Sequence, residues 1–158
     1  MKDDWVAYLE SIDLTEVLRG KVQEVVCFYQ QVHAEQIQDI FVTEYVDKAG
    51  NRQYGSVWLF SEELIMEAKR FVNAHDFDST PLKQRVHYWQ IKKNEYDFQS
   101  ATKESRMVLD IVLSPDTSCE LKASGKNCDY LKAVFIKHVV PNLSKCPVAA
   151  QIDACGCQ

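Results

Sequence analysis

A chain of 158 residues with 46% apolar content can bury one hydrophobic core without disulfides or metals, which predicts a single folded domain. The formal net charge of -5 disfavours binding to nucleic acid or anionic membranes, because such a chain repels phosphate groups unless a local basic patch forms. No apolar run approaches the ~20 residues of a transmembrane helix, and residues 1–5 lack a secretory signal, so we expect a cytoplasmic protein without transmembrane contact.

Residues 1–35 are predicted to form a helical segment that packs on the following domain. Asp13 followed by Glu16 is typical of a helix start, and apolar residues then recur at helical spacing over residues 14–32. The segment before this helix is too short to fold alone. Its large side chains either hold the helix in place or contact another chain: Trp5, Tyr8 and Leu9.

The hydrophobic period then changes to two, which predicts β-strands. Strands at 40–45 and 53–60 flank a hairpin turn at Gly50, and a third strand follows at 64–71. Residues 73–83 have many turn formers and no period, so they are predicted to be a loop. Further alternating runs bring the total to about seven strands: 85–92, 95–99, 105–113 and 118–124.

A second amphipathic helix is predicted from Asn127, in a capping position, to Pro141. Its apolar stripe must cover the open side of the sheet, since no other large apolar surface is available. Residues 143–158 lose all periodicity and are predicted to be a loosely held tail containing cysteines.

Two segments resemble small bacterial domains of the pleckstrin-homology-like (PH-like) family. They are residues 56–71, SVWLFSEELIMEAKRF, and residues 121–131, LKASGKNCDYL, where the last strand turns into the helix. The order of elements over residues 36–142 is also similar. The resemblance implies an α+β fold, a seven-stranded antiparallel PH-like barrel or sheet closed by a C-terminal helix, here with an added N-terminal helix. It also implies a binding platform for phosphoinositides, peptides or proteins.

The resemblance suggests two candidate binding sites. Lipid-binding members carry a basic cluster on the first hairpin, where this chain offers only Lys48 and Arg52 beside Asp47, so the hairpin is either a phosphoinositide site or a solvated turn. Peptide-binding members use the groove between the C-terminal helix and a strand edge. In this chain the groove would use Leu64 and Met66 of the third strand, or the neighbouring strand edge, together with Lys132 and Lys137 of the helix.

The first helix either blocks that groove or forms a homodimer with the same helix of a second molecule. The residues expected at such a contact are Val22, Val25 and Tyr29.

Three other constellations have competing interpretations. His75 and Asp78 in the predicted loop allow a small-ligand or metal-dependent enzyme as an alternative. The aromatic and basic residues between 88 and 96 suit either single-stranded nucleic acid or, more simply, core packing with lysines at a strand edge. Cys146, Cys155, Cys157 and His138 are possible zinc ligands; the alternative is a tail in which the three cysteines are free thiols.

Six cysteines are otherwise expected to be reduced, with Cys27, Cys119 and Cys128 in the core. The sequence therefore predicts a non-enzymatic module that binds a protein or peptide, with no cofactor, no metal and no nucleic acid.

Overall fold

The computed structural model describes residues 1–73, 76–81, 86, 88–94, 105–114 and 117–143. Two helices come first, α1 (Asp3–Ser11) and α2 (Glu16–Val32). Seven strands follow: β1 (Asp39–Val46), β2 (Arg52–Phe60), β3 (Leu64–Lys69), β4 (Asp76–Pro81), β5 (Tyr88–Asn94), β6 (Arg106–Ser114) and β7 (Thr117–Ser124). The last helix, α3 (Asn127–Val134), continues directly into a π-helix, η1 (Phe135–Val139), and a 3-10 turn, η2 (Val140–Asn142).

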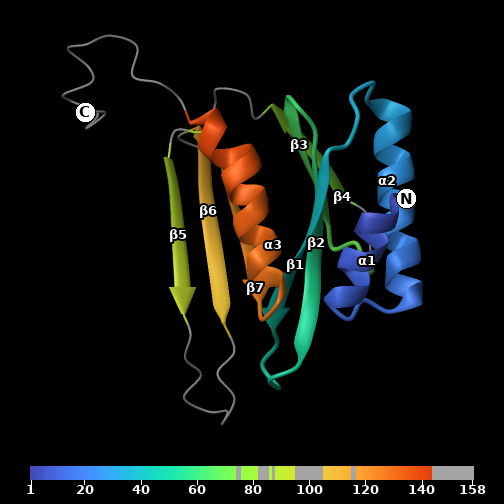
Figure 1. Cartoon of the computed structure of the whole chain (residues 1–158), viewed down its shortest axis with the longest axis vertical. Coiled ribbons are helices and arrows are strands. Elements are labelled where there is room, and N and C mark those ends of the chain that lie inside the picture. Colours follow the sequence, from blue (N-terminus) through green and yellow to red (C-terminus); the bar gives the residue numbers. More distant parts are fainter. Residues whose placement is uncertain (74–75, 82–85, 87, 95–104, 115–116, 144–158) are drawn as a thin grey trace, which may run out of the picture.

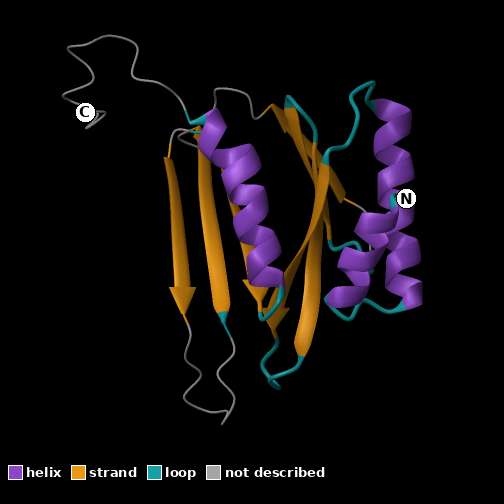
Figure 2. Ribbon diagram, in the orientation of Figure 1, coloured by secondary structure: helices purple, strands orange, loops and turns teal. Residues whose placement is uncertain are grey.

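The strands form two antiparallel sheets, one of β1 to β4 and one of β5 to β7, each in sequence order. Helices α1 and α2 lie on the outer side of the four-stranded sheet, and α3 lies across the opening between the two sheets (Figures 1 and 2). Because both faces of the four-stranded sheet are covered, residues 40–44 of β1 and 57–60 of β2 are buried without interruption.

The three-stranded sheet has one buried and one half-exposed face. In β6, Met107, Leu109, Ile111 and Leu113 are buried, and the residues between them are only partly covered. The alternation of apolar and polar residues predicts this strand correctly, because one face of the sheet lies on the core and the other is half-exposed.

The predicted seven-stranded barrel, or single sheet, is wrong, because the strands belong to two separate sheets that do not close. The edge strands β1 and β7 lie next to each other. A register irregularity follows Val42 in β1, and the Glu44 carboxylate accepts hydrogen bonds from the backbone N–H (3.0 Å) and the hydroxyl (2.5 Å) of Ser124. We call this contact between β1 and β7 the seam. Here the Glu44 side chain supplies hydrogen bonds where two paired strands would use their backbones.

Some predictions made from local sequence are wrong, because contacts with distant residues decide the structure at those positions. Residues 76–81 form β4 instead of a loop, because they pair with β3. Helix α2 is capped by Thr15, whose hydroxyl accepts from the N–H of Leu18 at 3.4 Å, and not by Asp13. Cys27 is exposed instead of lying in the core, whereas Cys119 is half-buried and Cys128 is buried. The strand expected at 95–99 lies outside the described residues.

Asn127 is not a helix cap either, since its side chain joins three elements. Its Oδ1 accepts from the Tyr8 hydroxyl at 2.8 Å, its Nδ2 donates to the carbonyl of Val42 at 2.8 Å, and the N–H of Val42 donates to the Tyr8 oxygen at 3.0 Å. Burial raises the pKa of Tyr8 well above its usual value, which keeps the phenol protonated. The first residues of the chain therefore form a helix, α1, that is fastened to β1 and α3.

Candidate functional site

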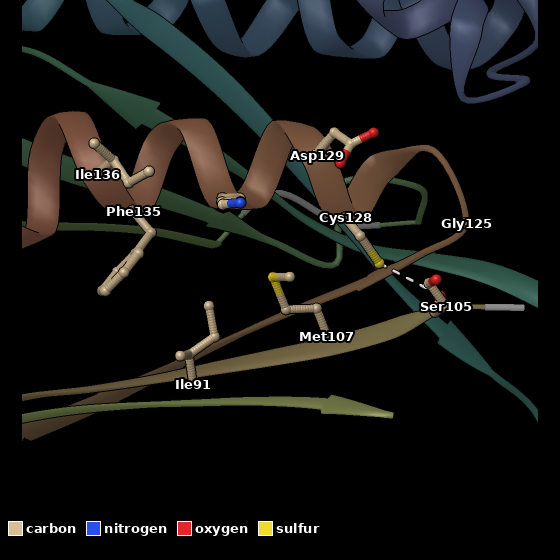
Figure 3. A pocket seen from close by; sticks show the side chains of 9 residues that line it. Ile91, Ser105, Met107, Gly125, Cys128, Asp129, Phe135 and Ile136 are labelled. Atoms are coloured by element: carbon tan, nitrogen blue, oxygen red, sulfur yellow. Dashed lines mark hydrogen bonds between the residues drawn. The ribbon is translucent and has the colours of Figure 1, made fainter. Parts of the chain in front are cut away.

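The main candidate site is a cavity of about 380 Å³ between α3 and the β5–β6 side of the three-stranded sheet (Figure 3). We call it the α3–β5 groove. It is lined by Ile91 of β5, Ser105 and Met107, Gly125, and Cys128, Asp129, Lys132, Phe135 and Ile136 along the helix.

The two walls of the groove follow from the periods of their elements. Ile91 lies two residues after Trp89, so both point to the same face of β5, and the helical spacing of Cys128, Lys132 and Phe135 places them along one side of the helix. Figure 3 shows Phe135 and Cys128 directed toward the sheet, where Met107 and Ile91 face them. The result is a largely apolar cleft.

Two contacts hold the helical wall in place. The Phe135 ring meets the Trp89 ring edge to face, with centroids 4.7 Å apart, and the Cys128 thiol donates to the carbonyl of Ser105 at 3.4 Å. The groove thus has preformed walls.

The groove lies beside a strand edge. Strand β5 pairs with β6 on one side, and no strand among the described residues pairs with its other side. Alternate backbone N–H and C=O groups of an edge strand point outward and offer hydrogen bonds to an added strand.

Further exposed apolar side chains follow the groove toward the end of the helical segment; we call them the exposed stripe. Ile136 is 55% exposed, and Val140 in η2 and Leu143 just after it, which pairs with Val86, are each 42% exposed. Groups of exposed apolar side chains are typical of a contact surface for another molecule.

A second cluster lies where η1 meets β1. Oδ2 of Asp39 is 2.6 Å from Nε2 of His138 and 2.7 Å from Nζ of Lys137, and the imidazole stacks on Phe60 at 4.9 Å between ring centroids. Burial alone would raise the pKa of Asp39, but the hydrogen bonds from His138 and Lys137 outweigh it and lower that pKa.

An Asp–His pair can orient a general base, but nucleophilic catalysis also needs a hydroxyl or thiol bonded to the imidazole. Among the described residues, no hydroxyl or thiol has a hydrogen bond to the His138 ring. The cluster therefore acts as a clamp that fixes the π-helix to β1.

The two basic residues predicted to bind phosphate on the first hairpin have different environments, because ion pairs hold only one of them. The guanidinium of Arg52 pairs with the buried carboxylate of Glu44 and lies 3.3 Å from Asp13, while Lys48 is exposed in the turn. Burial alone would lower the pKa of Arg52, but Glu44 outweighs it and raises that pKa. A phosphate group would have to compete with two carboxylates for Arg52.

The predicted partner residues are not brought together. Lys132 lines the α3–β5 groove, whereas Lys137 pairs with Asp39. Leu64 and Met66 lie on β3, Met66 is only 1% exposed, and the main strand contacts of α3 are with β7, β1 and β6.

The groove edge is therefore β5, which sequence reasoning missed. The signal for it is the pair of Trp89 and Ile91 on one strand face, in the segment for which the sequence offers nucleic-acid binding or, more simply, core packing.

The face of α2 expected to form a dimer is unavailable in this fold. Val22, Val25 and Tyr29 are completely buried against the rest of the protein. Any self-association through α2 would have to use other residues.

The predicted enzymatic and zinc sites find no support in the described residues. His75 lies outside them, and Asp78 is in β4, opposite Glu67 of β3. The three tail cysteines also lie outside them, and His138 is bonded to Asp39. Within the described ranges, no group of three or more His, Cys, Asp or Glu residues is placed to hold a metal ion, and no helix is long and apolar enough to cross a membrane.

Comparison with known proteins gives no relative from which a role can be transferred. A scan against protein-family models, a search of curated proteins and a search of solved structures each found no match to this chain.

Proposed function

We propose that this protein is a non-enzymatic interaction module that binds an extended segment of another protein in the α3–β5 groove. The observation that carries the proposal is an apolar cleft of about 380 Å³ beside the edge of β5 that is left unpaired among the described strands. An extended segment can add to such an edge through backbone hydrogen bonds while its side chains enter the cleft.

Three further features support this role. The groove walls are held by the Trp89–Phe135 contact, so little ordering is needed on binding. The exposed stripe from Ile136 to Leu143 lengthens the contact surface. The resemblance to PH-like domains, many of which are binding platforms, agrees with the proposal and remains a prediction, as does the cytoplasmic location.

The proposal is tested by selecting binders from a phage-displayed library of random 12-residue peptides against the whole chain. Selected peptides are then made synthetically, and their dissociation constants are measured by fluorescence polarisation. We expect micromolar binders whose addition shifts the NMR signals of Ile91, Met107 and Ile136.

Two substitutions by uncharged Gln, both at exposed apolar positions, distinguish binding at the groove from binding elsewhere on the surface. Ile136→Gln at the groove should weaken binding about tenfold, because an apolar contact is lost and a polar amide is buried. Val17→Gln on α2, where Val17 is 72% exposed, should leave affinity unchanged. Equal effects of the two substitutions, or peptides that shift signals only elsewhere, would exclude the groove as the binding site.

A further inference from the structure

We infer that the segment bound in the α3–β5 groove is acidic and carries a large apolar side chain as its anchor. The inference rests on the proposed function and names the chemistry of the ligand. It comes from the distribution of charge along the chain and over the fold.

The negative charge of the chain is concentrated at its N-terminal end. Residues 1–46, which include α1, α2 and β1, contain nine acidic and three basic residues, a net charge of -6. Residues 88–143, which include the three-stranded sheet and α3, contain seven acidic and eight basic residues, a net charge of +1. The groove therefore lies outside the strongly negative part of the chain, so nearby cations can decide which ligand charge it favours.

Lys132 is the cation best placed to meet a ligand. It lines the groove and is exposed, and its side chain has no ion pair or hydrogen bond with another described residue. By contrast, Lys137 is held by Asp39, and Lys122 pairs with Glu120 at 2.9 Å. Lys126, also exposed, follows the lining residue Gly125 at one end of the groove.

One carboxylate, that of Asp129, also lines the groove. Figure 3 shows it on the outer side of the helix, directed away from Met107 and Ile91. The carboxylate of Asp129 is thus directed away from the apolar wall of the groove, which leaves Lys132 as the lining residue that can attract an acidic ligand.

The floor of the groove favours a large apolar anchor. Phe135, Met107 and Ile91 surround the cavity, and thioether and aromatic groups of this kind pack well against an aromatic ring. The ligand chemistry that fits is an extended acidic segment with one aromatic or large aliphatic side chain directed into the cleft.

The test uses the best peptide from the library selection, remade in three forms with acidic, amide or lysine residues beside its apolar anchor. An acidic residue about 4 Å from Lys132 at the surface should tighten binding about fivefold over the amide form. The preference should shrink with added salt, because exposed charges are screened.

Lys132→Met keeps the length of the side chain and removes its charge, so it should abolish the preference for the acidic form. Lys132→Arg should retain it. Lys48→Met, at an exposed lysine in the distant hairpin turn, is the matched control and should change nothing.

The outcomes distinguish the two proposals. Peptides that bind the groove with equal affinity in all three forms, or with a preference for lysine, would overturn the inference and leave the proposed function intact. The absence of any peptide that binds at the groove would overturn both.

Discussion

Removal of the Glu44 carboxylate should loosen the seam between the two sheets. The side chain is 1% exposed and accepts hydrogen bonds from the N–H and hydroxyl of Ser124 and from the guanidinium of Arg52. In Glu44→Ala, the N–H of Ser124 loses its acceptor inside the protein, and Arg52 keeps its contacts with Asp13 and with the Tyr54 ring.

The expected loss of unfolding free energy is about 3 kcal/mol. Breaking one side of a buried charge pair costs about 3 to 5 kcal/mol, and the lower value applies because the Arg52 side chain is 31% exposed and can be rehydrated. Glu44→Gln keeps an oxygen acceptor for Ser124 and removes the charge, so about half of this loss is expected.

Urea unfolding followed by tryptophan fluorescence measures the effect. With a slope of about 2 kcal/mol per molar urea, Glu44→Ala should lower the midpoint by about 1.5 M. The control is Glu120→Ala, which removes an ion pair with Lys122 that is half-exposed on both sides and should cost less than about 1 kcal/mol. If the two variants lose similar stability, the seam does not depend on the carboxylate.

Three further predictions concern stability, measured by the same urea titrations. Although burial alone would raise the pKa of Asp39, its hydrogen bonds with His138 and Lys137 lower it, so its contribution to stability is present above pH about 4 and is lost as the pH falls through the lowered pKa. Asp39→Asn should remove this loss of stability below about pH 4, and an unchanged pH profile would contradict the clamp. Asn127→Ala should cost about 2 to 4 kcal/mol, because the Tyr8 hydroxyl and the Val42 carbonyl lose their partner, and a cost below about 1 kcal/mol would mean that water replaces it. A Cβ at Gly55 would lie 2.8 Å from Oγ1 of Thr43, so Gly55→Ala should destabilise by about 1 to 3 kcal/mol, whereas Gly20→Ala, in open space on α2, should stabilise by about 1 kcal/mol; effects of the same sign would refute this steric argument.

Much of the element order was readable from local patterns. The alternation of Met107, Leu109 and Ile111 predicted β6, and the apolar period over residues 14–32 predicted α2. These signals survive because each element has one face on the core and one face toward water, which is the condition for a visible period.

The site was less predictable, because its two walls come from segments far apart in the chain. Lys132 was identified as a partner residue from its place on the last helix, and the structure puts it in the groove. The opposite wall was assigned to Leu64 and Met66, because periodicity reports which residues are buried and not which strand a helix covers. Ile91 and Met107 form that wall instead.

The sequence by itself determined the secondary structure over most of the described chain and the presence of a covering C-terminal helix, since these depend on neighbours within a few residues. Only the tertiary structure decided that the strands divide into two sheets, that α1 and α3 meet through Asn127, and that β5 is the strand whose residue Ile91 faces α3 across the groove. These features depend on contacts between residues many positions apart, such as Glu44 with Ser124, and no local pattern encodes such a pairing.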